Sequence, residues 1–163
     1  MKQILFSTSR SWSPVIIRVL LGLVLGAHGA QKLFGLFGGY GFEGTMNFFT
    51  GTVGLPPIVG LMVIVIEFFG SLSLLAGLAT RLWSASMVFL FLGIVFTSHL
   101  QNGFFMNWFG NQKGEGYEFF ILAIGMAASL VLSGAGAFSA DRLLFSVRER
   151  KPDRPFGART ATA

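Results

Sequence analysis

Cysteine is absent from this chain of 163 residues, and charged residues are scarce. Without a thiol the protein can form no disulfide, offers no cysteine nucleophile and holds no thiolate-bound metal. Charged residues make up 12% of the sequence, whereas hydrophobic residues make up 53%. This balance places the chain among integral membrane proteins.

Metal and haem motifs are also missing. The two histidines, His28 and His99, form neither a His-x-x-His nor a Glu-x-x-His pair, and no Cys-x-x-Cys-His motif is present. The sequence therefore predicts neither a metal site nor a haem site. The net charge of +5 comes mostly from basic residues between Arg142 and Arg159. We interpret these residues as an orientation signal rather than a nucleic-acid surface, because no solvated basic domain accompanies them.

The sequence contains four long apolar segments, at about residues 14–35, 56–79, 82–101 and 117–138. About 20 apolar residues in a helix cross roughly 30 Å of hydrocarbon. The predicted fold is therefore all-α, a polytopic membrane four-helix bundle.

The predicted bundle is one transmembrane domain over residues 14–144, after a cytoplasmic leader at 1–13 and before a basic, partly disordered cytoplasmic tail at 145–163. Lys and Arg are concentrated in the leader, in the tail and at Arg81 between the second and third segments. Both termini are therefore predicted to be cytoplasmic. The tight turn between those two segments is placed at Thr80-Arg81, and it makes them antiparallel neighbours.

Two long loops combine glycine with aromatic residues. The first runs from Leu36 to Leu55 and the second from Asn102 to Gly116. Aromatic residues are enriched at the bilayer interface, and clustered glycines break regular structure. We predict that both loops lie on the outer membrane surface, with a short interfacial helix over Glu43–Phe49.

A single carboxylate, Glu67, lies inside the second apolar segment. At about 1.5 Å per residue it is roughly 16 Å from Pro56, near the bilayer midplane. Placing an ionised side chain at this depth costs roughly 2.5 kcal/mol or more of free energy. Such a residue is therefore expected to have a charge partner or a function. Helical spacing puts Glu67 on one face with Gly70 and Gly77, a small-residue face that lets another helix approach. We predict that Glu67 faces the protein interior and has a functional or packing role.

Arg18 and His28, on the first segment, are the predicted charge partners of Glu67, because Glu67 lies between them in depth. Alternatively, Arg18 has no functional role and is an anchor whose side chain extends to the inner lipid headgroups.

Lys32, His99 and Glu118 come near the outer end of three different segments. We predict that they line the outer mouth of a polar column below the aromatic loops. The alternatives are that Lys32 and Glu118 are ordinary interface residues and that His99 caps a helix.

A carboxylate in such a column can accept or donate a proton, as a site for the carbonyl or hydroxyl of a quinone requires. Aromatic loops above a polar cavity suit a lipid-soluble ring. A packed structural bundle would show the same features.

Several groups of residues between Arg18 and Leu144 carry a family resemblance. They are Arg18 with Gly29-Ala30-Gln31-Lys32-Leu33, Glu67 with Gly70, Gly77 and Arg81, His99-Leu100-Gln101-Asn102-Gly103-Phe104-Phe105 with Asn107-Trp108, and Gly134-Ala135-Gly136 with Ser139 and Asp141-Arg142-Leu143. Together they resemble the DoxX family of small bacterial membrane proteins. The resemblance implies a four-helix protein of the bacterial inner membrane. It also implies redox chemistry, since relatives include a membrane subunit of thiosulfate:quinone oxidoreductase and subunits of oxidative-stress complexes.

The functional hypothesis from the sequence is a quinone-interacting subunit of a redox or oxidative-stress complex, in which a partner protein supplies electrons. An alternative is a non-enzymatic membrane scaffold or chaperone-like protein whose outer loops bind another protein. A third is a small-solute or proton pathway. Besides the lipid bilayer, the predicted partners are a redox protein or further copies of this chain in a homo-oligomer.

Overall fold

Every regular element is helical in the part of the chain that the structure, a computed structural model, describes, which is residue 8 and residues 11–145. The α-helices are α2 (Ser13–Phe34), α3 (Gly41–Asn47), α4 (Pro57–Val65), α5 (Ser71–Ala76), α6 (Thr80–Ile94), α7 (Glu118–Ser133) and α8 (Ala140–Phe145). Three π-helical turns lie at Phe48–Thr52, Ile66–Gly70 and Val95–His99, and short 3-10 turns lie at Leu36–Gly38 and Leu100–Asn102. The predicted all-α class is confirmed. The predicted interfacial helix corresponds to α3.

Three helices are long and apolar enough to cross a membrane. They are α2, the continuous helix Pro57–Ala76 made of α4, a π turn and α5, and the helix Thr80–Asn102 that begins with α6. The chain is therefore a membrane protein. The fourth predicted span corresponds to α7, an apolar helix of 16 residues, so the fourth crossing stays a prediction.

Glycines set where several helices end. α2 begins with Pro14 in its first turn and ends at Gly35, whose φ of 74° is easy only for glycine. α7 stops at Ser133, before the expected residue 138, because Gly134 has φ 76° and ψ −162°. The reversal between α5 and α6 lies at Gly77–Ala79, just before the predicted Thr80-Arg81. Gly77 (φ 67°) and Ala79 (φ 48°) are both left-handed there.

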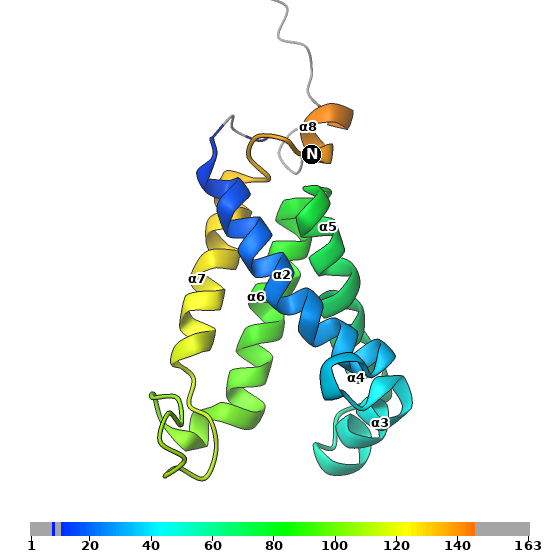
Figure 1. The fold of residues 1–163 in the computed structure, drawn as a ribbon, viewed down its shortest axis with the longest axis vertical. Coiled ribbons are helices and arrows are strands. Elements are labelled where there is room, and N and C mark those ends of the chain that lie inside the picture. The colour runs from blue at the N-terminus through cyan, green and yellow to red at the C-terminus, as the bar shows by residue number, and fades with distance from the viewer. Residues whose placement is uncertain (1–7, 9–10, 146–163) are drawn as a thin grey trace, which may run out of the picture.

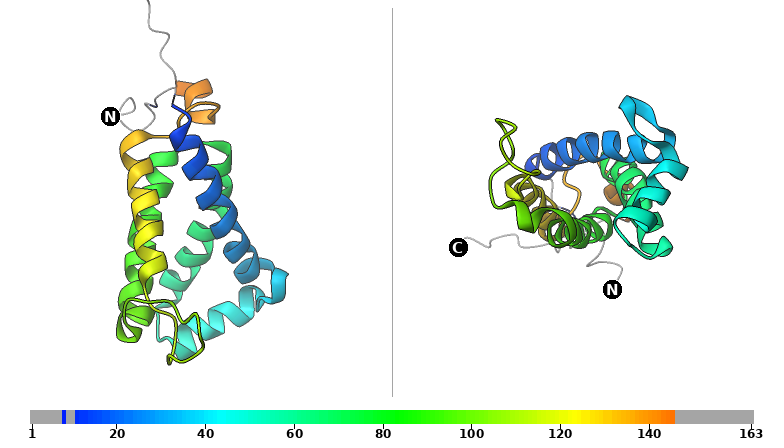
Figure 2. Two further views of the ribbon diagram at one scale, coloured as in Figure 1. Left: turned by 60° about the vertical axis from the view of Figure 1, so that its left-hand side comes forward. Right: turned by 90° about the horizontal axis from the view of Figure 1, so that it is seen from below.

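The long helices form a bundle that opens toward one end (Figure 1). α6 and α7 run side by side, and α2 crosses the bundle obliquely, packing on α5 and α7. Toward the end that carries α3, α2 and α4 diverge from α6 and α7 in the view of Figure 1, and the left view of Figure 2 shows α2 running obliquely to α7. We call this the loop end, and the opposite end, with Ser11 and α8, the terminal end.

The apolar core joins α2, α5, α6 and α7. Its buried members are Leu21, Leu25, Leu74, Met87, Phe91, Ala123, Ala127 and Leu130. Leu21 and Leu25, its two members on α2, are four residues apart, as expected for one face of a helix. The core therefore fixes the side of α2 that faces the bundle.

Candidate functional site

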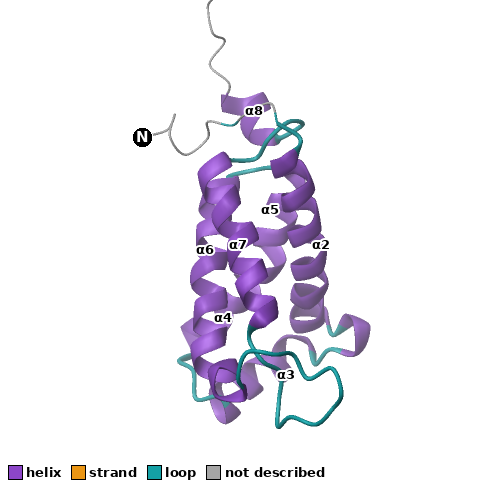
Figure 3. Ribbon diagram, turned by 90° about the vertical axis from the view of Figure 1, so that its left-hand side faces the viewer, coloured by secondary structure: helices purple, strands orange, loops and turns teal. Residues whose placement is uncertain are grey.

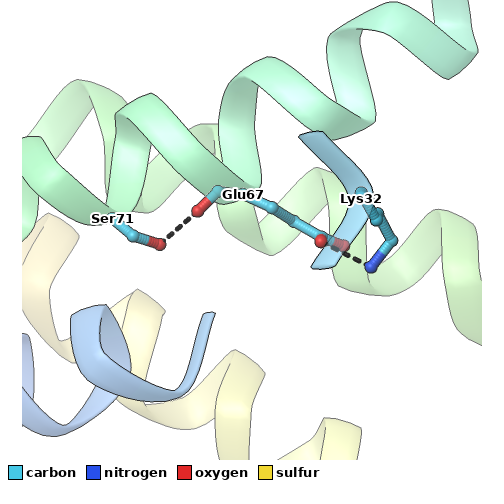
Figure 4. A network of polar contacts seen from close by, with 3 residues as sticks. All are labelled: Lys32, Glu67 and Ser71. Atoms are coloured by element: carbon cyan, nitrogen blue, oxygen red, sulfur yellow. Dashed lines mark hydrogen bonds and ion pairs between the residues drawn. The ribbon is translucent and has the colours of Figure 1, made fainter. Parts of the chain in front are cut away.

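Glu67 lies in the π-helical turn Ile66–Gly70, in the middle of the second long helix. It is 3% exposed. The Ser71 hydroxyl donates a hydrogen bond to the backbone carbonyl of Glu67 (Figure 4). Single π turns inside α-helices occur frequently at functional sites. This turn was not predicted, because no residue pattern marks it.

The charge partner of Glu67 is Lys32. Lys32 Nζ lies 2.6 Å from Glu67 Oε2, and the two side chains are 24% and 4% exposed (Figure 4). The expectation that Arg18 or His28 would pair directly with Glu67 is therefore corrected. Lys32 shares the face of α2 that holds Leu21 and Leu25, so its side chain points toward the bundle rather than toward lipid.

A close helix contact holds α2 against the Glu67 turn. A Cβ atom added at Gly29 would lie 2.6 Å from Phe68 N and 2.8 Å from Glu67 C. Only glycine allows the two backbones to approach this closely. Because Lys32 lies less than one turn beyond Gly29, the same contact brings Lys32 level with Glu67.

His28 is adjacent to this pair without being bonded to it. Its side chain is exposed, and it is close enough to Glu67 for their charges to interact. His28 is thus a third ionisable side chain, at the edge of the Lys32–Glu67 pair.

Arg18 has a different environment, at the terminal end. It is 3% exposed, and within the described residues its guanidinium donates to backbone carbonyls. The acceptors are the oxygens of Leu74 (2.8 Å), Leu75 (2.6 Å), Ala135 (3.0 Å), Ala137 (3.5 Å) and Phe138 (2.7 Å). We call this group the Arg18 carbonyl cage. Arg18 therefore joins α2, the end of α5 and the chain after α7, and it is neither an anchor at the headgroups nor the partner of Glu67.

Asp141 completes the packing next to the cage. Its carboxylate accepts hydrogen bonds from Ala79 N (2.6 Å) and Thr80 N (3.0 Å), which caps the start of α6. Asp141 N donates to Gly77 O at 2.9 Å. The sequence named Asp141 only as part of the family resemblance, and Gly77 there and on the small-residue face that carries Glu67. Their proximity shows that these motif residues build the terminal end.

The three residues predicted to line the outer mouth, Lys32, His99 and Glu118, have different partners. His99 Nδ1 contacts Glu115 O at 2.8 Å, and its ring packs on Phe120. Glu118 Oε1 accepts from Met106 N (2.9 Å) and Trp108 Nε1 (3.1 Å). His99 and Glu118 therefore hold the second loop in place, whereas Lys32 bonds to Glu67. Glu115, which the sequence did not single out, also holds this loop, through Asn107 N at 2.7 Å.

Comparison with known proteins gives two matches. A family model described as DoxX matches residues 13–100, which contain Arg18, His28, Lys32, Glu67 and His99. A Bacillus subtilis (strain 168) protein named "Putative oxidoreductase CatD" is 29% identical over 131 residues, which is 80% of this chain and 86% of the relative. No solved structure matches.

Proposed function

The chain belongs to the DoxX family of membrane proteins, as its sequence motifs indicated, and we propose that it binds the head group of a quinone at the Lys32–Glu67 pair. The observation that carries the proposal is the ion pair between half-buried Lys32 on α2 and buried Glu67, which lies on a π turn within a helix long and apolar enough to cross a membrane. An intramembrane ionisable pair is expensive to retain and is commonly functional. The name of the Bacillus relative supports redox chemistry.

The pair has hydrogen-bonding capacity left for a ligand. An ammonium group has three donors, and Lys32 uses one of them on Glu67 Oε2. Glu67 Oε1 receives no hydrogen bond from the described residues. A quinone carbonyl can therefore accept from Lys32, and a hydroquinone hydroxyl can donate to Glu67. His28 at the edge supplies a further group that can hold a proton.

The position of the proposed site inside the membrane limits which ligands and partners can use it. A site within a membrane-spanning bundle is reached by a ligand that dissolves in lipid, as quinones do. The bundle has no electron source of its own in this proposal, so a partner protein would supply the electrons. The proposed location is the bacterial inner membrane, where such a complex would meet the quinone pool.

Bound quinone in the purified protein is the test. Protein in lipid discs is extracted with solvent, and quinone is counted by mass spectrometry for wild type, Glu67→Gln and Lys32→Met. Loss of a hydrogen bond to a charged group costs about 1.5–3 kcal/mol, so we expect roughly 10-fold less quinone or lower in both variants. Glu43→Gln, the same change at an exposed position on α3, is the control and should retain wild-type quinone. Equal quinone in wild type and Glu67→Gln would refute the proposal.

A scaffold is the second candidate, because much of the polar column bonds within the protein. Arg18, Glu115 and Glu118 all hold backbone groups in place. If Glu67 has the same role, Glu67→Gln lowers the unfolding temperature and no quinone copurifies with wild type. The quinone count and the unfolding temperature of one variant thus separate the two candidates.

A further inference from the structure

One face of α2 is buried near the terminal end and exposed near the loop end. Leu21 and Leu25, both 4% exposed, lie on this face and belong to the core together with residues of α7. His28 and Lys32 continue the same face at helical spacing, where His28 is exposed and the side chain of Lys32 is 24% exposed. We call these four residues the inner stripe of α2. Within the part of the chain that the structure describes, α7 therefore covers the first half of this stripe and leaves the second half open.

α7 shows the same gradient of burial. Leu130 and Ala127 have no exposed surface and Ala123 is 3% exposed, whereas Phe120, in the first turn of α7, is only partly buried. Figure 3 shows α7 beside α6, with the second loop at the loop end, and the left view of Figure 2 shows α2 running obliquely to α7. The burial of both helices thus agrees with a separation between α2 and α7 that widens toward the loop end.

The opposite side of the Lys32–Glu67 pair is closed by a helix contact. Gly29 brings α2 against the backbone of Phe68. The rings of Phe34 and Phe68 meet edge to face there, with their centroids 5.1 Å apart. A ligand that comes from within the bilayer therefore reaches the pair from the side of α7.

The two sides of this approach differ in polarity. On one side the Lys32–Glu67 pair offers an ammonium group and a carboxylate. On the other side α7 offers the ring of Phe120, which packs against the core with its centroid 6.1 Å from that of Phe91. A molecule with a polar ring and an apolar tail matches both sides, because the ring can form hydrogen bonds with the pair while the tail packs on aromatic carbon.

We propose that α2 and α7 admit the quinone between them, and that its apolar tail leaves the bundle between His28 and Phe120 while its ring is at the Lys32–Glu67 pair. This inference rests on the proposed quinone function and adds the class of quinone, one that carries an isoprenoid tail. Contact between the tail and Phe120 strengthens binding, so the same ring without a tail binds more weakly.

Photolabelling of the full-length protein in lipid discs tests the position of the tail. The probe is a benzoquinone whose prenyl tail carries a photoreactive diazirine on its first isoprene unit, and illumination attaches the tail to the residues around it. Mass spectrometry identifies the labelled residues with and without an excess of the same quinone lacking the diazirine. Label that the excess quinone removes reports the specific site.

We expect this competed label on residues 119–124 of α7 and 24–28 of α2. Competed label that is absent from these residues and present elsewhere, for example on Phe34 or Phe69, would overturn this inference and leave the quinone proposal standing. No competed label on any residue would overturn both.

Phe120→Ala and Phe119→Ala are matched variants at neighbouring positions of α7. Phe119 is 40% exposed and lies about 100° from Phe120 around the helix axis. Because a phenyl ring that packs on the tail removes apolar surface from water, we expect Phe120→Ala to lower the affinity for the tailed quinone about fivefold or more and that for the ring without a tail less than about twofold. Phe119→Ala should change neither affinity by more than about twofold. Equal effects of the two variants would contradict the proposed path, and the labelling of the unaltered chain does not require either variant to fold.

Discussion

Arg18 shows how one buried side chain can hold three segments of a membrane protein together. A guanidinium has five N–H donors in a fixed plane, and the Arg18 carbonyl cage presents five oxygens. These carbonyls lie at the end of α5 and after α7, where the helices leave backbone groups without intrahelical partners.

Arg18→Lys should therefore destabilise the protein although it keeps the charge. A single ammonium group cannot reach both sets of carbonyls, and each buried polar group left without a partner costs about 1–3 kcal/mol. We expect a loss of roughly 2 kcal/mol or more in the free energy of unfolding, measured in lipid discs. Arg142→Lys, on the partly exposed side of α8, should stay within about 0.5 kcal/mol of wild type. Equal stability of the Arg18 and Arg142 variants would show that the cage contributes little.

Glu67 could be found from the sequence, but its partner could not. A lone carboxylate in an apolar run indicates a buried polar site whatever the fold. Its partner depends on how the helices cross, and the depth estimates treated them as upright rods with aligned ends. In the structure α2 crosses obliquely and touches the second long helix at Gly29, which brings Lys32 to Glu67 and leaves Arg18 at the other end.

The contact between α2 and the Glu67 turn depends on one missing side chain. At Gly29 an added Cβ would meet backbone atoms that cannot move aside, at 2.6 Å. On α7, by contrast, an added Cβ at Gly125 would meet nothing within 4 Å.

The matched pair Gly29→Ala and Gly125→Ala tests this contact. Forcing a methyl group into a close-packed contact costs about 1–3 kcal/mol, so Gly29→Ala should lower the unfolding free energy by that amount. It should also reduce bound quinone, because Lys32 and Glu67 move apart. Gly125→Ala should be neutral or stabilise by up to about 1 kcal/mol, because alanine favours helix. A Gly29→Ala protein as stable as the Gly125→Ala protein would contradict this packing.

The apolar runs in the sequence predicted where the long helices lie. The glycines predicted the ends of these helices less accurately. α7 ends five residues before the expected Phe138, because the glycine at 134 is left-handed and breaks the helix immediately. The π turns were missed because no residue pattern marks them. The separate roles of His99 and Glu118 were missed because their hydrogen bonds depend on how the second loop folds.

The hydrogen bonds of the terminal end determine the path of α7 through the molecule. Ala137 and Phe138, just after α7, bond to Ser11 and Arg18 at the start of α2. Glu118, at its beginning, bonds to the second loop at the loop end. α7 thus runs from one end of the bundle to the other, and we predict that it crosses the bilayer although it has only 16 residues.

A chain without native cysteine allows a direct topology test. We expect a membrane-impermeant maleimide, added to intact cells, to label Gln112→Cys in the second loop and to leave Ser9→Cys and Ala161→Cys unlabelled. Labelling of Ala161→Cys together with Gln112→Cys would mean that α7 does not cross. Labelling of Ser9→Cys and Ala161→Cys without Gln112→Cys would mean that the bundle has the opposite orientation.

The π turn at Ile66–Gly70 also limits how the length of this helix can change. A π turn holds about one residue more than an α-helical turn, so deleting one residue there would restore an α-helix. Because the wider turn accommodates the extra residue, the side chains from Ser71 onward would keep the faces that they have now. Deleting a residue from the α-helical part that follows, at Leu72 for example, would instead rotate every later side chain by about 100° around the helix axis. Leu74, which has no exposed surface, would then leave the interior, and Gly77 would turn away from Arg18. This helix can therefore lose a residue at the π turn but not in the α-helix beyond it.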